Sequence, residues 1–418
     1  MVLFAAVGGI GRRLRGDRAG LIAVYIAGTL PLLYGLSRWY LVEYPLAAAV
    51  AVTFWLALVA AESLSLVAVA TLGLACGFGL LLKADFPLFI FPALIYVALR
   101  RGIGMRGVVA FLVPCAVIAA PWYAFNWRAT LQNAIAAGFG KSATVQGTGP
   151  IFSSGAILAY LGMVVNRGVS AYYVVLGGIA LIVVVIQRRF GVLRQMAILG
   201  LWVAPFLVFL FGGNKDVRYI APILPAFALA LACMVDAATQ DRKWIAAAAL
   251  VFPFVGSLAV SFGWPYQSPG LGYAIRYDRN SWGQEEILSA IAGDMEYRYG
   301  ERRTILLATD RAHFNADNFS LAVAERQLPL QVDTTAYSTS LDQVMLQAER
   351  AAYVVYKQGG EPESPFFNTH YAELLARLKH STDWKEMPFS RRTPDGGMAY
   401  IVRHLRPCEV APETCSLP

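Results

Sequence analysis

Residues 64–99, LSLVAVATLGLACGFGLLLKADFPLFIFPALIYVAL, contain two long apolar runs separated by a charged break. The break consists of Lys83, Ala84 and Asp85, and Pro87 follows it closely. A helix needs roughly 20 mainly apolar residues to cross the hydrocarbon core of a bilayer. The runs at 64–82 and 87–99 therefore predict two membrane helices that meet at a polar turn at one face of the membrane.

Comparable apolar runs lie on both sides of this stretch. Together they predict about nine transmembrane segments, at residues 19–36, 45–61, 64–82, 87–99, 108–123, 171–186, 197–211, 220–235 and 244–262. Residues 1–10 are apolar but too short to cross, and they lack the basic start and cleavage site of a signal peptide. We therefore expect a polytopic α-helical membrane protein whose sequence begins near the end of a helix.

The composition of the 418-residue chain agrees with this expectation. Its residues are 57% hydrophobic and 15% charged, and the mean hydropathy is +0.52. Soluble globular domains are about 45–50% apolar and about 25% charged. The composition therefore argues against a purely cytosolic enzyme and excludes a disordered chain, a collagen and a disulfide-rich miniprotein.

The net charge of +8 is distributed unevenly along the chain. Residues 1–263 carry 19 Lys and Arg against 7 Asp and Glu, a net charge of +12, whereas residues 264–418 have a net charge of −4. We therefore predict a membrane domain at 1–263 and a soluble domain at 264–418. Loops between membrane helices account for the basic excess, so we predict no nucleic-acid partner.

The basic residues also predict an orientation, because cytoplasmic loops of membrane proteins carry an excess of Lys and Arg. Alternate loops hold twelve basic residues, which are Arg12, Arg13, Arg15, Arg18, Arg100, Arg101, Arg106, Arg188, Arg189, Arg194, Arg242 and Lys243. The opposite loops hold seven, which are Arg38, Lys83, Arg128, Lys141, Arg167, Lys215 and Arg218. We therefore expect residues 264–418 to lie outside the cytoplasm, in the periplasm or its equivalent.

The C-terminal part alternates short apolar segments with amphipathic ones. Strands are predicted at 304–309, 352–356 and 398–403, and helices at 316–326, 341–350 and 371–378. This alternation predicts a small α/β domain. Cys408 and Cys415 fall on the proposed oxidising side, where they either close a small disulfide loop or remain two free thiols.

Charged residues near span ends are the candidate site. Glu43, Asp85 and Asp216 lie at predicted exterior ends, next to basic residues that are Arg38, Lys83, Lys215 and Arg218. Ionisable groups in membrane segments are costly and mark functional sites by default. Helix-end ion pairs and snorkelling side chains are the alternative interpretation.

Four local sequences resemble those of the GT-C glycosyltransferases, and more narrowly the bacterial relatives of dolichyl-phosphate-mannose–protein mannosyltransferases. They are SRWYLVEYPL at 37–46, GFGLLLKADFP at 77–87, Pro121-Trp122-Tyr123 followed by Asn126, and KDVRYIAPILP at 215–225. These segments occur in the order expected for that family and, with the spans around them, extend the resemblance over roughly residues 1–262.

The resemblance implies transfer of a sugar from a polyprenyl-phosphate donor to a glycan, lipid or protein acceptor at the exterior face of the bilayer. Lys83 and Arg218, with Arg38 next, would stabilise the negative charge of the lipid-phosphate leaving group. Glu43 occupies the family's acidic position and would be a catalytic residue and the ligand of a divalent metal, Mg²⁺ or Mn²⁺, if one is used.

Six further residues are predicted to bind substrate, namely Asp85, Lys215, Asp216, Tyr219, Trp122 and Tyr123. No nucleotide is expected, because GFGKS at 138–142 lacks the first glycine of a P-loop. No haem is expected either.

One departure from the family concerns the start of the chain. The family has a complete first helix and a large exterior loop whose carboxylate is thought to act as general base, and neither precedes the first span here. We interpret this as an N-terminal truncation or a misassigned start; supply of the missing part by another chain, and a non-catalytic remnant, are the alternative explanations. We assign no general base. A lipid or sugar transporter, and a non-catalytic scaffold, are the alternative functions.

Overall fold

The computed structural model contains two compact units, Met1–Tyr277 and Asp278–Pro418. The predicted boundary after residue 263 precedes this division, and a short hairpin between the two positions packs on the helical unit. The structure describes residues 1–39, 41–63, 65–101, 104–140, 143, 147, 150–240, 242–266, 270–275, 280–296, 303–336, 338, 340–364 and 370–405. Cys408 and Cys415 lie outside the described residues, so their pairing stays a prediction.

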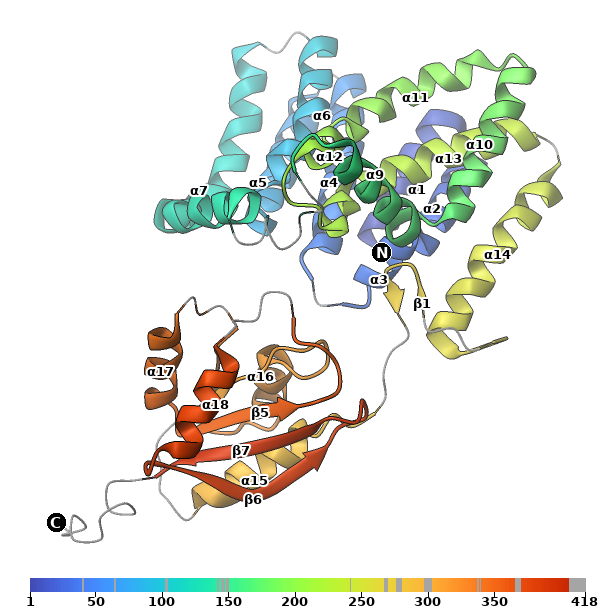
Figure 1. Ribbon diagram of the computed structural model, residues 1–418. Helices are drawn as coiled ribbons and strands as arrows, with labels where there is room; N and C mark the ends of the chain where they lie inside the picture. The colour runs from blue at the N-terminus through green and yellow to red at the C-terminus, as the bar shows by residue number, and fades with distance from the viewer. Residues whose placement is uncertain are drawn as a thin grey trace. The chain divides into compact units, whose positions relative to one another are not determined.

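The first unit consists of helices and the hairpin (Figure 1). Its first half contains α1 (Val2–Arg15), α2 (Asp17–Thr29), α3 (Pro31–Leu36), α4 (Glu43–Ser63), α5 (Leu66–Leu82), α6 (Phe86–Arg101) and α7 (Met105–Phe139). Its second half contains α9 (Ser154–Met163), the π-helix η1 (Val164–Val169), α10 (Ala171–Ile186), α11 (Phe190–Val203), α12 (Phe206–Phe211), the 3₁₀-helix η2 (Val217–Ile223), α13 (Leu224–Thr239) and α14 (Lys243–Phe262).

Every apolar run that predicts a membrane segment lies mainly in helix. The runs at 19–36 and 197–211 are each divided between two helices at a proline, Pro31 and Pro205, and the run at 220–235 begins in η2 and continues in α13. Within the described residues, four helices are long and apolar enough to cross a membrane, at Glu43–Ser63, Met105–Ala136, Val217–Thr239 and Trp244–Phe262. A bent pair, Ser154–Val169 with Ala171–Ile186, adds a fifth if it forms one span. The number nine therefore stays a prediction, and α9 with η1 was not predicted.

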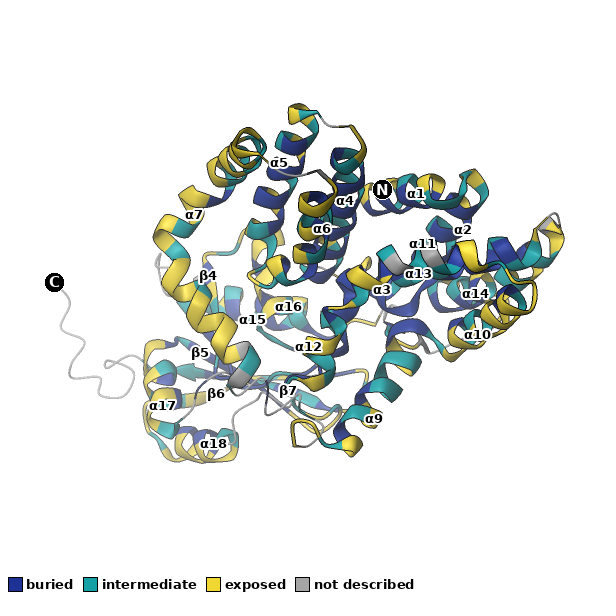
Figure 2. Ribbon diagram, turned by 90° about the horizontal axis from the view of Figure 1, so that it is seen from above, coloured by how far each residue is buried: buried dark blue, intermediate teal, exposed yellow. Residues whose placement is uncertain are grey.

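The core of the helical unit lies where α1, α2, α4 and α13 pack together. Leu229, Leu231 and Ala232 of α13 are fully buried, whereas α7 exposes Leu112 and Val117 (Figure 2). In a membrane protein, apolar side chains that the protein does not cover face lipid. The exposed apolar surface of α7 therefore agrees with a helix at the periphery of the bundle.

The hairpin consists of β1 (Gly270–Leu271) and β2 (Ala274–Ile275). Its turn includes Gly272, whose φ of +60° favours glycine, and a Cβ there would lie 2.8 Å from the carbonyl oxygen of Asn166 in η1. A Cβ at Gly35 of α3 would lie 2.8 Å from the carbonyl oxygen of Tyr273. The hairpin is therefore fitted closely against α3 and η1 because both glycines lack side chains.

The second unit is a five-stranded mixed sheet with helices on its faces, in the strand order β4-β3-β5-β7-β6. β3 pairs in parallel with β4 and β5, and β7 pairs antiparallel with β5 and β6. The strands are β3 (Arg303–Leu307), β4 (Leu330–Thr334), β5 (Tyr353–Gln358), β6 (Trp384–Arg392) and β7 (Met398–His404). The helices are α15 (Gln284–Glu296), α16 (Ala316–Glu325), α17 (Leu341–Arg350) and α18 (Tyr371–His380).

Successive side chains of a strand point to opposite faces of the sheet, so a sheet covered on both faces has two cores. Ile305 and Leu307 face one core, which includes residues of α15 and α16. Leu306 and Val354 face the other, which includes residues of α17 and α18. The three predicted strands and three predicted helices are present, whereas α15, β4 and β6 were missed.

Candidate functional site

Lys83 lies at the centre of a charged cluster formed by helix ends. It ends α5 in an extended conformation, so the chain turns there before α6. Its Nζ lies 3.3 Å from Oε1 of Glu43, the first residue of α4, and 3.5 Å from Oδ2 of Asp85. It also lies 4.3 Å from the centre of the Tyr219 ring. The charged break in the sequence thus brings one ammonium group between two carboxylates and over an aromatic face.

A second ion pair is built at the start of η2. Asp216 caps this helix, with Oδ1 accepting from the backbone N–H of Arg218 at 2.9 Å and Oδ2 accepting from its Nε at 2.7 Å. Asn214 in turn accepts from the backbone N–H of Asp216 at 3.0 Å. Arg218 is close enough to Glu43 for their charges to interact, and Tyr219 interacts with Lys83 and Asp85. The two ion-paired groups therefore form one cluster.

The predicted substrate-binding residue Lys215 precedes Asp216, but its ammonium group binds backbone carbonyls and not the carboxylates of the cluster. It is 3% exposed, and its Nζ donates to the backbone carbonyls of Phe209, at 3.1 Å, and of Leu210, at the end of α12. A lysine in this position satisfies carbonyls that a helix end leaves without partners. The structure therefore gives its ammonium group a capping role.

The other three predicted residues are Arg38, Tyr123 and Trp122, and each contacts a residue outside the cluster. Arg38 is exposed, with its guanidinium 5.5 Å from the Tyr34 ring. The Tyr123 hydroxyl donates to the carbonyl of Leu80 at 2.9 Å, and Trp122 packs edge-on against the Tyr123 ring at 5.0 Å. Tyr123 therefore ties α7 to the last turn of α5, the turn that positions Lys83.

Two residues beside the cluster, Tyr273 and Arg167, were not predicted from the sequence to be site residues. Tyr273 of the hairpin interacts with the charges of Arg218, Asp216, Glu43 and Arg167, and burial raises its pKa to about 12. Its ring lies 5.9 Å from the Arg167 guanidinium. The glycines around it indicate a turn, but no spacing in the sequence predicts that the turn reaches the helix ends at Lys83 and Arg218.

Two carboxylate oxygens of the cluster, Glu43 Oε2 and Asp85 Oδ1, are buried without a hydrogen-bond partner among the described residues. Carboxylate oxygens are the ligands that Mg²⁺ and Mn²⁺ prefer, and Mg²⁺ keeps several waters when a protein supplies only one or two carboxylates. No group of three His, Cys, Asp or Glu that could hold a metal occurs within the described residues. The donor set therefore fits a hydrated hard cation and not a closed zinc site.

The second unit has a polar cluster next to the end of β3. Arg311 is 7% exposed, and its Nε donates to Oε1 of Glu363 at 2.7 Å. Glu363 also accepts from Thr309 Oγ1 at 2.9 Å, and His313 Nδ1 lies 3.1 Å from Oε1 of Glu361. Because Glu363 is satisfied by groups of its own unit, it holds the loops after the strands together.

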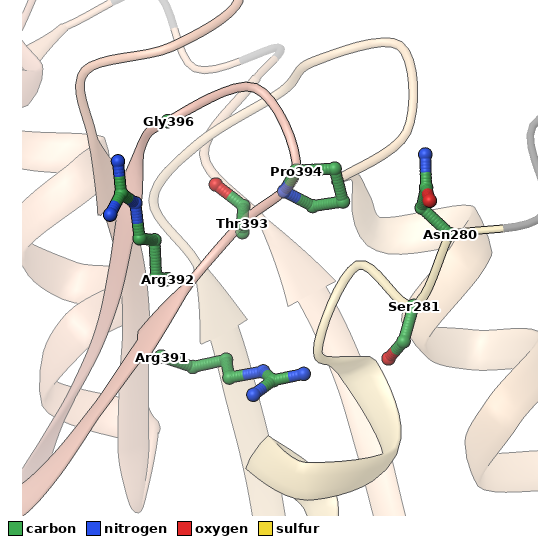
Figure 3. A pocket seen from close by; sticks show the side chains of 7 residues that line it. All are labelled: Asn280, Ser281, Arg391, Arg392, Thr393, Pro394 and Gly396. Atoms are coloured by element: carbon green, nitrogen blue, oxygen red, sulfur yellow. The ribbon is translucent and has the colours of Figure 1, made fainter.

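A shallow pocket of about 490 Å³ lies near the turn between β6 and β7 (Figure 3). It is lined by Asn280, Ser281, Arg391, Arg392, Thr393, Pro394 and Gly396. The Arg391 guanidinium points towards Ser281 and pairs with Glu286 at 2.9 Å. The pocket is polar, but one of its two guanidinium groups is already neutralised.

Comparisons with known proteins agree with this description of the helical unit. Residues 1–125 match the family model of dolichyl-phosphate-mannose-protein mannosyltransferase. This match confirms the predicted resemblance to that family over residues 1–125. No curated protein matches the chain.

Two solved structures resemble the chain. ArnT from Cupriavidus metallidurans, in the apo state, is 13% identical with a TM-score of 0.53, and the match covers 96% of this chain and 81% of that one. The apo oligosaccharyltransferase from Archaeoglobus fulgidus is 12% identical with a TM-score of 0.46, over 84% of this chain and 57% of that one. The likeness to ArnT shows that the two chains share a fold.

Proposed function

We propose that this protein is a membrane glycosyltransferase that moves a sugar from a polyprenyl-phosphate donor to a glycan, lipid or protein acceptor. The observation that carries the proposal is the cluster at the ends of α4, α5 and η2. There, Lys83 and Arg218 are held by Glu43, Asp85 and Asp216. The family match over residues 1–125, which include Glu43, Lys83 and Asp85, supports it.

The chemistry of the leaving group explains why two cations are needed. When the bond between the anomeric carbon and the phosphate oxygen breaks, negative charge grows on the lipid phosphate. Preorganised donors aimed at developing charge are a major source of rate enhancement. Arg218 offers a planar fork for two phosphate oxygens, and Lys83 supplies a compact charge. Both side chains retain exposed surface, 30% for Arg218 and 23% for Lys83, through which a ligand can reach them.

The carboxylates fix these cations before substrate arrives. Glu43 and Asp85 hold Lys83, and Asp216 holds Arg218 through two of its nitrogens. The free oxygens of Glu43 and Asp85 would hold a divalent cation, which would supply further positive charge for the phosphate. Arg38 and Tyr219 would line the approach of the donor, and we assign no general base.

We place the cluster and the second unit outside the cytoplasm, in a bacterial cytoplasmic membrane, on the distribution of Lys and Arg among the loops. An alkaline phosphatase fused after Pro418 should be active in intact cells. A full-length fusion that is present in the membrane but inactive would contradict this orientation, because the reporter's disulfides do not form in the cytoplasm.

The test of the function uses matched variants of helix α4. Glu43→Gln removes the charge at the cluster, whereas Glu62→Gln removes the same charge at the other end of the same helix, where Glu62 pairs with Arg13 at 3.8 Å. Sugar transfer from polyprenyl-phosphate donors is measured in membranes that contain equal amounts of each variant.

Glu43→Gln and Lys83→Met should each lower the rate at least a hundredfold, on the scale of losing one preorganised charge at a reaction centre. Glu62→Gln should keep the rate within about twofold, because an exposed ion pair contributes little. Full transfer by both cluster variants would refute the assignment of the site.

A further inference from the structure

The ion-paired cluster has more negative than positive charge. Its five charged side chains are three carboxylates, Glu43, Asp85 and Asp216, and two cations, Lys83 and Arg218. The neighbouring Lys215 directs its ammonium group to backbone carbonyls. Lys83 and Arg218 attract a phosphate that enters the cluster, but the three carboxylates beside them offset part of that attraction, since the net charge of the five groups is −1. Phosphate recognition therefore requires a further cation that the carboxylates do not neutralise.

Arg167 meets this requirement. It lies in η1, a π-helix, and its side chain is exposed. Among the described residues it forms no ion pair, and its guanidinium carbon lies 5.9 Å from the centre of the Tyr273 ring. Short π-helical segments are rare and occur frequently at functional sites. The guanidinium is therefore held in place by an aromatic face, and its hydrogen-bond donors have no partner in the part of the chain that the structure describes.

Tyr273 connects Arg167 to the cluster. Its backbone N–H donates to the carbonyl of Arg167 at 3.0 Å, and its ring packs against Trp39 at 5.4 Å. The charges of Arg218, Asp216 and Glu43 contribute to the electrostatic environment of its phenol. Gly35 and Gly272 leave no room for side chains here, so the position of the ring is fixed by close backbone contacts.

We propose that Arg167 binds the phosphate of the polyprenyl-phosphate donor and that Tyr273 positions it. The inference rests on the proposed function and deepens it, because it identifies the residue that selects the phosphate end of the lipid. A guanidinium with unused donors binds phosphate oxygens in the bidentate geometry that lysine does not provide. The Tyr273 ring holds the guanidinium through a cation–π contact, which does not require the hydroxyl group.

The experiment measures binding of decaprenyl phosphate and of the uncharged decaprenol to the purified full chain in detergent. Arg167→Ala is compared with Arg128→Ala, because Arg128 is also exposed and lies over an aromatic ring, Trp127, at 5.4 Å. Arg167→Ala should weaken binding of decaprenyl phosphate at least tenfold and leave binding of decaprenol unchanged. Arg128→Ala should change neither.

Two variants of Tyr273 separate positioning from general damage to the fold. Tyr273→Phe keeps the ring and should retain the preference for decaprenyl phosphate over decaprenol. Tyr273→Leu should lose most of that preference while still binding decaprenol. Inorganic phosphate in millimolar excess should not displace decaprenyl phosphate, and displacement would overturn the assignment to a lipid phosphate.

Undiminished binding of decaprenyl phosphate by Arg167→Ala would overturn the inference while leaving the proposed function in place. An equal loss in Arg128→Ala would also overturn it, because the effect would then come from general positive charge. If the unsubstituted chain showed no preference for decaprenyl phosphate over decaprenol, the proposed function and the inference would both be contradicted.

Discussion

Among single residues, Lys357 shows how this chain stabilises a buried charge. The side chain is fully buried in β5, and its Nζ pairs with Oδ2 of Asp395 and lies 5.0 Å from the Trp282 ring. Breaking such a pair by removing one partner typically costs 3–5 kcal/mol, since it leaves a buried charge unpaired. Asp395 therefore anchors the turn between β6 and β7 to the strand beside it.

This pair predicts a loss of stability at low pH. Burial alone would raise the pKa of Asp395, but hydrogen bonds from Lys357, Thr393 and two backbone N–H groups outweigh it and hold the pKa well below its usual range. A carboxyl whose pKa is depressed by folding stabilises the folded state above its unfolded pKa of about 4. That contribution, on the order of 2 kcal/mol, is lost as the pH falls towards the folded pKa.

The measurement is thermal unfolding of the second unit within the full chain, from pH 7 to pH 2. Asp395→Asn should be less stable than the unsubstituted chain at pH 7, and the difference should shrink as the pH falls below 4. Asp342→Asn, at an exposed position in the first turn of α17, serves as the control and should show no such trend. A difference that is independent of pH would contradict the ion-pair account.

The sequence indicated the charged residues of the cluster but not Arg167 and Tyr273 beside it, and the difference has a physical reason. Glu43, Lys83 and Asp85 stand out because charge at the end of an apolar run is costly. Arg167 and Tyr273 do not, because a basic residue in a loop and a tyrosine in a turn are common. Their importance depends on the bend at η1 and the docking of the hairpin, which neither composition nor spacing specifies.

Among the elements, two glycines of α5 allow its backbone to pack directly against that of α7. A Cβ at Gly73 would collide with the carbonyl of Phe111 in α7, and one at Gly77 would lie 2.9 Å from the carbonyl of Cys115. Glycines four residues apart let two membrane helices approach closely. The backbone contact between α5 and α7 thus fixes the helix that ends at Lys83.

We expect Gly73→Val to separate α5 from α7, because neither backbone can yield without losing helical hydrogen bonds. The thermal midpoint of the purified chain should fall by several degrees, corresponding to the 1–3 kcal/mol typical of overpacking. Gly178→Val is the matched control, since a Cβ at that exposed position of α10 would meet open space. Equal midpoints for the two variants would show that the contact is not needed.

Apolar length predicted the helices well but not their breaks. The run at 19–36 becomes α2 and α3, with Pro31 at the first position of α3. A 94° bend separates Ser154–Val169 from Ala171–Ile186, and Ser170 there has a φ of +82°. Proline is visible in a sequence, whereas a serine with positive φ is not, because tertiary packing imposes that conformation.

For the whole molecule, the uneven distribution of charge predicts a boundary after residue 263, whereas the two compact units meet between Tyr277 and Asp278. The apolar, basic part became the helical unit and the acidic part the mixed sheet with its helices. The hairpin at 270–275 belongs to the helical unit although its sequence resembles a soluble loop. Composition separates membrane from soluble segments, but it does not reveal which loops return to the membrane part.

The most direct test of the central claim is the amount of polyprenyl-phosphate-linked sugar in the lipids of the native cell. The unsubstituted gene is replaced by one that encodes Lys83→Met, and total lipids are compared by mass spectrometry. If the chain consumes a lipid-linked donor, that donor should accumulate at least several-fold in the variant and return to normal when the unsubstituted protein is restored. An unchanged pool of every polyprenyl-phosphate-linked sugar, with the variant present at the normal level, would contradict the account.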